Sequence, residues 1–231
     1  LGAVQAKVAA LDQDTVQYRE DMDALRTFCR QKRLPNEMRL RLKEYFRHRR
    51  ALLKDVASNR LIEELSPGLR GEVTRYCFSD WLAQVPWVRD GADGFRTTLA
   101  LSLKPSMYSP TELVSGFDLH VVLRGIVIKD ARIITRGQVW GTDVILTASK
   151  LRQLEPARTL TYVQLYSISA DELGAILHAY PSETRRVRAA ALWMALRRGL
   201  LWFAREMQAT SDAIVELVRA ARERGVDARR H

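Results

Sequence analysis

A change in the spacing of apolar residues near Lys104 constrains the fold of this 231-residue chain more than any other feature. Before that point, apolar residues recur every three or four positions, which is the spacing of amphipathic helices. From Met107 to Ser169 they fall into short β-type runs such as "LHVVL" and "RIIT", separated by turn pairs such as Arg124-Gly125. Helical spacing returns after Ser169. The sequence therefore predicts an α+β chain in which a small antiparallel β-roll lies between two helical regions.

The helical region before Lys104 is divided by prolines. "YREDMDALRTFCRQ" places Met22, Leu25 and Cys29 on one face of a helix. Pro35 suits the first position of a second helix, and Ser66-Pro67 is expected to open a third. A further apolar face is expected at the start of the chain, formed by Leu1, Val4, Val8 and Leu11.

The region after the roll begins with a strong helix-start signal. "SADE", Ser169 to Glu172, has the pattern of a capping box, in which the hydroxyl and the carboxylate each satisfy an amide at the helix end. A long helix is expected from about Glu183 to Arg224, with a break at Gly199 or near Thr210-Ser211. Four of its residues approach heptad spacing, but the repeat is short, so packing on the roll is favoured over a coiled coil of subunits. These residues are Met207, Ile214, Val218 and Ala221.

The positive charge of the chain is concentrated in one segment. The sequence has 37 Lys and Arg against 27 Asp and Glu, a net charge of +10. Between Arg26 and Lys54 there are eleven basic residues and two acidic ones, so this segment carries 11 − 2 = +9. Such a surface suits nucleic acid, anionic lipid or an acidic protein surface. Because the sequence has no recognition-helix motif, zinc spacing or aromatic RNA platform, nucleic acid is the least favoured partner.

Catalytic and metal-binding patterns are missing from the sequence. The four histidines are isolated, with no HExxH-type spacing, and no serine lies in a nucleophile elbow. Cys29 and Cys77 have no CxxC spacing, so both are expected to be buried free thiols. No uncharged apolar run is long enough to span a bilayer. The chain begins at Leu1 without an initiator Met, so we expect it to be part of a longer protein.

Five segments resemble, in the same order, the cytoplasmic C-linker and cyclic nucleotide-binding homology domain of hyperpolarisation-activated, cyclic nucleotide-gated and ether-a-go-go potassium channels. "QYREDMDALRTFCRQKRLPNEMRLRLKEYFRHR" is similar to the first two linker helices, and "LIEELSPGLRGEV" to the next pair. "MYSPTELVSGFDLHVVLRGIV" resembles the entry strands and "RGQVWGTDVILT" the phosphate cassette. "TYVQLYSISADELGAILHAYP" resembles the last strands and the following helix. The resemblance covers residues 1 to about 200.

The resemblance implies a regulatory module on the cytoplasmic side of a membrane, not an enzyme. It implies a helical linker over residues 1–80, which continues the pore-lining helix and assembles four subunits into a ring. It implies a cyclic nucleotide-binding homology domain over 81–225, with the β-roll at about 105–169 and C-terminal helices at about 170–225. A basic stripe in the linker is either a solvated face, or it meets acidic groups of a neighbouring subunit or anionic lipid heads. The stripe consists of Arg39, Arg41, Lys43, Arg47, Arg49 and Arg50.

The resemblance also locates a ligand pocket. Nucleotide-binding members of the family have a Gly-Glu pair in the cassette and a later Arg that holds the cyclic phosphate, because a fork of donors suits a phosphate anion. Gly141 matches the glycine, but Thr142 stands in the place of the Glu, with Asp143 one residue on. The Arg position falls on Gln153, between Arg152 and Leu154. Since a one-residue shift turns a strand side chain to the other face, Arg152 can replace the missing Arg only if the loop bulges.

These departures predict a degenerate pocket that does not bind cyclic AMP or cyclic GMP at physiological levels, and no other cofactor is expected. The alternative is a functional cyclic-nucleotide sensor with a divergent pocket. In ether-a-go-go channels a segment of the same chain occupies the pocket through a Tyr-Asn-Leu-like signature. The corresponding place here, around Ala195 and Leu196, does not carry that signature.

Overall fold

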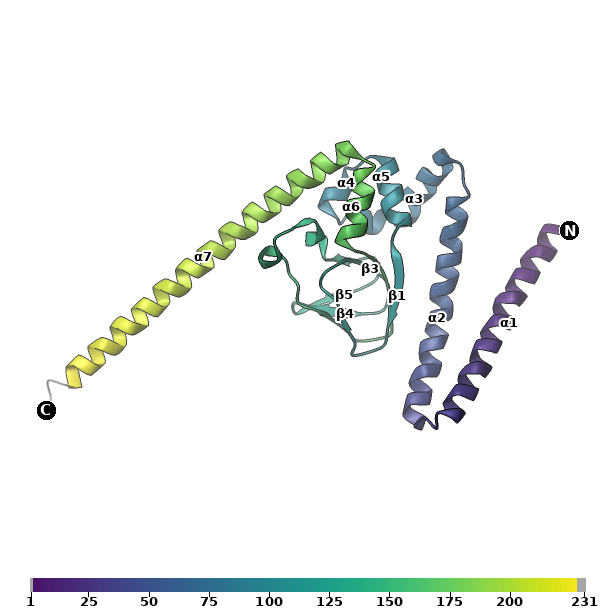
Figure 1. The fold of residues 1–231 in the computed structure, drawn as a ribbon, viewed down its shortest axis with the longest axis horizontal. Helices are drawn as coiled ribbons and strands as arrows, with labels where there is room; N and C mark the ends of the chain where they lie inside the picture. The colour runs from purple at the N-terminus through teal and green to yellow at the C-terminus, as the bar shows by residue number, and fades with distance from the viewer. Residues whose placement is uncertain (1, 228–231) are drawn as a thin grey trace.

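The computed structural model describes the backbone of residues 2–227 and the side chains of residues 16, 18–53, 55, 56 and 59–216. It confirms the predicted α+β class, because helices occupy both ends of the chain and a two-sheet roll lies between them (Figure 1). Among the described residues, no helix combines the length and the hydrophobicity needed to cross a membrane.

The chain opens with an antiparallel helical hairpin (Figure 1) formed by α1 (Gly2–Gln31) and α2 (Asn36–Glu63). The predicted face of Met22, Leu25 and Cys29 is buried, and it packs against half-buried residues of both helices, including Phe46. Pro35 is the residue before α2 rather than its first helical residue, since its ψ of 152° is extended. The side chains of the face predicted from Leu1 to Leu11 lie outside the described set.

Three shorter helices connect the hairpin to the roll: α3 (Pro67–Leu82), α4 (Pro86–Arg89) and α5 (Asp93–Leu101). Pro67 opens α3, as predicted. The buried stripe of α3 is made by Thr74, Phe78, Trp81 and Leu82. Cys77 falls beside this stripe and is exposed, so the prediction that both cysteines are buried is wrong for Cys77 and confirmed for Cys29.

The β-roll consists of two four-stranded antiparallel sheets. The first has the order β1-β8-β3-β6, and the second has the order β2-β7-β4-β5. Their bounds are β1 Lys104–Tyr108, β2 Leu113–Val114, β3 Leu119–Arg124, β4 Val127–Lys129, β5 Arg132–Ile134, β6 Val139–Trp140, β7 Ala157–Thr159 and β8 Val163–Ile168. Two 3-10 helices, η1 (Thr142–Ile145) and η2 (Ser149–Leu151), lie between β6 and β7.

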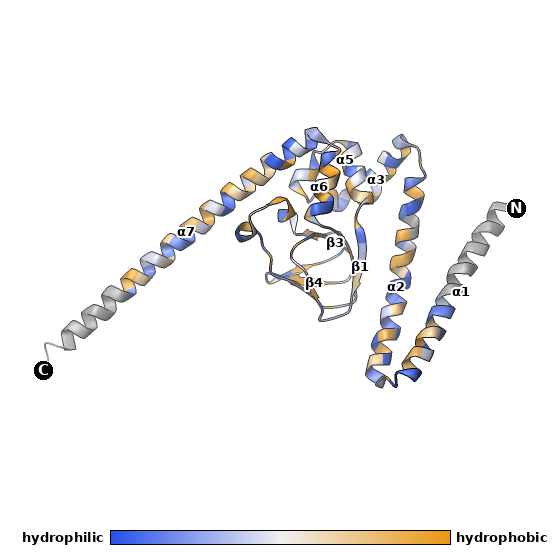
Figure 2. Ribbon diagram, viewed as in Figure 1, coloured by the Kyte–Doolittle hydropathy of each residue, from blue (hydrophilic) through white to orange (hydrophobic). Residues whose placement is uncertain are grey.

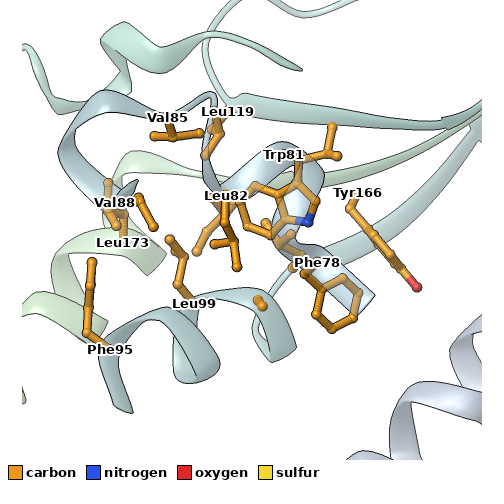
Figure 3. Close-up of a cluster of buried hydrophobic side chains, with 14 of the residues drawn as sticks. Phe78, Trp81, Leu82, Val85, Val88, Phe95, Leu99, Leu119, Tyr166 and Leu173 are labelled. Atoms are coloured by element: carbon orange, nitrogen blue, oxygen red, sulfur yellow. The ribbon is translucent and has the colours of Figure 1, made fainter. Parts of the chain in front are cut away.

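The largest hydrophobic cluster joins the helices to the first sheet. Phe78, Trp81 and Leu82 of α3 pack with Leu119 of β3 and Tyr166 of β8 in one cluster (Figure 3). The expected division at residue 80 therefore falls inside α3, within this shared core. The assignment of residues 1–80 and 81–225 to two units remains a prediction.

Polar contacts fasten α2 to strand β8 and the residue before it. The Tyr162 hydroxyl donates to the Arg41 carbonyl at 3.2 Å, and the Gln164 amide donates to the His48 carbonyl at 2.7 Å. The Asn59 amide donates to the Tyr166 hydroxyl at 2.6 Å. Because these bonds are spread along the helix, α2 is held against the first sheet over several turns.

The C-terminal helices are α6 (Ala170–His178) and α7 (Pro181–Asp227). The predicted capping box at the start of α6 is confirmed, with Glu172 N–H donating to Ser169 Oγ and Ser169 N–H donating to the Glu172 carboxylate. Glu172 also pairs with Lys104, which is the main reason that its pKa lies below the ordinary value.

Helix α7 differs from the prediction in two ways. It runs without the break expected at Gly199 or near Thr210, because a single glycine costs only about 1 kcal/mol in a helix of this length. It also projects away from the roll (Figure 1), so the expected packing of Met207 and Ile214 on the roll is wrong, and both side chains are exposed. Val218 and Ala221 lie outside the described side chains.

Candidate functional site

The cassette between β6 and η1 is built around a close backbone approach at Gly141. Gly141 has a φ of +76°, in the left-handed region, and a Cβ at this position would collide with the Asp118 carbonyl. Both constraints require glycine here. The tight approach predicted from the cassette sequence is confirmed, and it places the start of η1 against the loop before β3.

A cavity of about 330 Å³ opens beside this cassette. Four of the six predicted ligand residues line it: Gly141, Thr142, Asp143 and Gln153. The other lining residues come from the loop after α3, the β4–β5 hairpin, β6 with the turn before it, and α7, and they include Lys129, Asp130, Arg132, Gln138 and Arg198.

The remaining two predicted ligand residues, Arg152 and Leu154, do not line this cavity. The Arg152 guanidinium donates to the Phe117 carbonyl, outside the cavity. The Leu154 carbonyl lies against Gly116, so close that a side chain at Gly116 would not fit. Arg152 therefore does not share the cavity with the four predicted ligand residues that line it.

The Asp143 carboxylate is buried and already has two donors. The Gln153 backbone N–H donates to it at 2.7 Å, and the Arg198 guanidinium of α7 donates to it at 2.6 Å. Arg198 also donates to the Leu151 carbonyl at 2.7 Å. A side chain from α7 thus occupies the place where the cassette meets η2.

Sequence reasoning missed Arg198. It found no self-ligand signature around Ala195 and Leu196, and Leu196 is indeed exposed, but Arg198, two residues further, reaches the cassette. Arg198 is 55 residues from Asp143. No local pattern marks one arginine of a basic helix as the partner of so distant an acid, and only the direction of α7 selects it.

Two basic side chains face the cavity besides Arg198, and one of them is buried. The Lys129 ammonium group donates to the carbonyls of Gln153 at 3.3 Å and Glu155 at 2.6 Å, and it pairs with Asp130 at 3.8 Å. These bonds fix the segment that precedes β7. Because these partners already bind the Lys129 ammonium group, a ligand would have to compete with them for its charge.

His120 supports the cassette from the side of β3. Its ring stacks on Trp140 at 4.7 Å between ring centres, and Nε2 donates to the Ser115 carbonyl at 2.9 Å. Nδ1 therefore carries the lone pair, and it is buried with no hydrogen-bond partner among the residues that the structure describes. Burial lowers the pKa of His120 to about 4, so the ring is neutral at physiological pH.

The predicted basic stripe lies on α2. Arg39, Arg41, Lys43, Arg47 and Arg49 are exposed, whereas Arg50 is half-buried over the Tyr18 ring of α1 at 4.7 Å. Arg47 pairs with Glu44 at 3.0 Å on the surface of the same helix. The stripe is therefore mostly accessible, and its interpretation as a solvated or an interacting face stays open.

The architecture defines the class of domain. An α+β chain with two antiparallel sheets, a glycine cassette beside a cavity and helices at both ends is consistent with a cyclic nucleotide-binding domain. Among the described residues, no group of three or more His, Cys, Asp or Glu side chains could hold a metal ion.

The chain is similar to several known ion channels. It is 27% identical to the potassium/sodium hyperpolarization-activated cyclic nucleotide-gated channel 3 of Homo sapiens, over 86% of this chain and 27% of the relative. It is 24% identical to channel 1 of Oryctolagus cuniculus, over 83% of this chain and 23% of the relative. Channel 4 of that species is 25% identical, over 83% of this chain and 17% of the relative. No family model matches.

These similarities confirm the resemblance to hyperpolarisation-activated, cyclic nucleotide-gated channels that the five ordered segments predict. The chain spans about a quarter or less of the length of these three relatives.

Proposed function

We propose that this chain is the cytoplasmic gating and tetramerisation module of a cation channel of the hyperpolarisation-activated type, and not an enzyme. The similarity to such channels over most of the chain supports this function. In this proposal α1 connects the module to a membrane-embedded pore. Four copies assemble through α1 and α2, with the basic stripe facing acidic side chains of the neighbouring copy.

The way α2 is attached to the roll supports a gating role. The contacts of Tyr162, Gln164 and Asn59 link α2 to the first sheet, and α3 shares the main core with the same sheet. A shift of the roll would therefore displace the linker helices. The roll and the linker are suited to act as one mechanical unit beneath a pore.

The second part of the proposal is that the pocket is degenerate. The observation that carries it is the Asp143–Arg198 pair, because a side chain of α7 already pairs with the acid of the cassette. Thr142 and Gln153 replace the two charged groups that the resemblance associates with nucleotide binding. Losing two charge-assisted hydrogen bonds at about 1.5 to 3 kcal/mol each weakens binding by roughly two to four powers of ten.

Calorimetric titration of the chain with cyclic AMP and cyclic GMP tests this proposal. We expect no saturation below about millimolar concentration, as the lost bonds imply. The double variant Thr142→Glu, Gln153→Arg restores both charged groups and should bind at least about tenfold more tightly.

The matched control makes the same two changes outside the cavity, as Thr147→Glu and Gln208→Arg, and should not gain affinity. Micromolar binding by the unmodified chain would contradict the degenerate pocket and favour the alternative, a functional cyclic-nucleotide sensor.

A further inference from the structure

Helix α7 exposes a line of large apolar side chains that begins within the segment docked on the roll and continues past it. Figure 2 colours several residues along this helix as hydrophobic. Each member of this line is between 55% and 73% exposed, and two of them are aromatic. A soluble surface rarely leaves so many large apolar groups uncovered on one element. The members of the line are Trp193, Leu196, Leu200, Phe203, Met207 and Ile214; four other large apolar residues of α7 are also exposed and lie off the line, namely Leu192, Leu201, Trp202 and Val215.

The line repeats every seven residues. Its members are separated by alternating steps of three and four, and Thr210 fills the one remaining position between Met207 and Ile214. We call these seven residues, including Thr210, the α7 seam. In sequence the same steps continue through Leu217 and Ala221. A sustained seven-residue period is typical of a helix that winds around another helix, because a straight helix repeats every 3.6 residues.

The α7 seam lies opposite the face that docks on the protein body. Val187 is buried in the main core, and Arg198 bonds to Asp143 and Leu151. At about 100° per residue, Arg198 lies roughly 160° from Leu196 and Leu200 around the helix axis. A partner helix can therefore cover the seam without displacing any contact that α7 makes with the roll.

We propose that the α7 seam is an interface between two copies of this chain, which pair through a parallel coiled coil of their α7 helices. Six apolar side chains, each presenting roughly 100 Å² of surface, give on the order of 1,200 Å² across two copies, which is the size of a specific interface. Cyclic symmetry gives the helices the same direction. That direction rests on the proposed ring assembly, whereas the interface itself goes beyond the assembly proposed for α1 and α2.

Site-directed crosslinking of the 231-residue chain tests the seam. In a background with the exposed Cys77 changed to Ser, Phe203→Cys places a thiol in the seam and Leu201→Cys places one two residues away, outside it. Under mild oxidation, Phe203→Cys should form the disulfide-linked dimer at least about tenfold faster, since like positions of a parallel coiled coil face each other. Equal rates would overturn the proposal.

A charge substitution separates the seam from a general apolar surface. Leu200 and Leu201 are neighbours with similar exposure, but only Leu200 belongs to the seam. In the Phe203→Cys background, Leu200→Glu should slow crosslinking at least about tenfold, and Leu201→Glu should change it less than about threefold. Because both sites are exposed on the single chain, the two variants should keep the unmodified melting midpoint at concentrations too low for the copies to associate.

A second measurement is cosedimentation of the same variants with phosphatidylserine vesicles. If Leu200→Glu and Leu201→Glu both abolish crosslinking and reduce vesicle binding equally, the exposed face binds a membrane and the coiled coil is overturned. Crosslinking at Phe203→Cys reports α7 contacts, whereas variants of the α2 basic stripe report the linker assembly. Failure of one therefore does not imply failure of the other.

Discussion

At the scale of single residues, His120 combines burial with an unpaired nitrogen. The side chain is 2% exposed and stacked on Trp140, and within the described part of the chain Nε2 is the only ring nitrogen with a hydrogen-bond partner. Protonation would place a positive charge on the buried Nδ1, and the positive charge of Lys129 lies nearby. The folded protein therefore holds the ring neutral, with a pKa of about 4, well below the ordinary 6.5.

This depressed pKa predicts that stability falls in acid. Between pH 6.5 and about pH 4, His120 is protonated in the unfolded chain but stays neutral in the folded protein. Its contribution to the free energy of unfolding is therefore fully present above pH 6.5 and is lost as the pH falls towards 4. The shift corresponds to about 3 kcal/mol. In chemical denaturation at pH 7 and pH 4, His120→Gln should remove about this much of the pH dependence. His178→Gln, at an exposed site, should leave it unchanged, and equal effects would contradict the assignment.

The Asp143–Arg198 pair makes a second residue-scale prediction. Arg198→Gln leaves a buried carboxylate with one donor and should lower the free energy of unfolding by about 3 kcal/mol. Arg197→Gln removes the neighbouring exposed arginine and should have little effect in the same urea titration. Adding Asp143→Asn to Arg198→Gln should recover part of the loss. Similar costs for the two arginine variants would show that the pair does not stabilise the cassette.

At the scale of elements, the β4–β5 hairpin closes through a two-residue turn. Lys129 pairs with Arg132, so Asp130 and Ala131 form the loop, and both have positive φ, at 51° and 59°. These are the conformations of a type I′ turn, which matches the right-handed twist of the strands. The sequence places an alanine, Ala131, where this type of turn favours glycine.

Replacing this alanine should therefore stabilise the hairpin. Ala131→Gly relieves the left-handed strain of a side chain at the cost of some backbone entropy, for a net gain of about 0.5 to 1 kcal/mol. The same change in the exposed middle of α6, Ala175→Gly, should cost about 1 kcal/mol. Thermal unfolding should show a rise in midpoint for the first variant and a fall for the second. A fall for both would mean that the turn is not strained.

At the scale of the whole molecule, the basic stripe and the α7 seam occupy different elements. The basic stripe lies on α2, and the α7 seam lies on the helix at the other end of the chain (Figures 1 and 2). Interactions of the first kind are screened by salt, while those of the second kind are not. The dependence of assembly on salt concentration therefore distinguishes the two proposed interfaces.

Raising salt from about 0.1 M to about 1 M shortens the Debye length from roughly 10 Å to 3 Å and should weaken assembly through the linker. Sedimentation should show a lower average mass at high salt, with crosslinking at Phe203→Cys maintained. Arg41→Glu should weaken assembly at low salt by about tenfold, while Lys150→Glu on η2 should not. If neither salt nor Arg41→Glu has an effect, the stripe is a solvated face.

The sequence by itself determined the class of fold, the order of its parts and several local structures. The spacing of apolar residues located the helices and the roll, because helices and strands bury side chains with different periods. Ser169, Glu172 and Gly141 were correctly interpreted because capping and close backbone approach depend on neighbouring residues.

Only the tertiary structure decided what lies in the cassette and where α7 goes. The partner of Asp143 is set by the direction of a helix that begins nearly forty residues later, and the exposure of Cys77 by which face of α3 meets the sheet. Met207 and Ile214 also show that residue spacing does not decide what an apolar face contacts. Their spacing indicates an apolar face, but whether that face meets the roll or a second copy depends on the docking of Val187 and Arg198 on the opposite side.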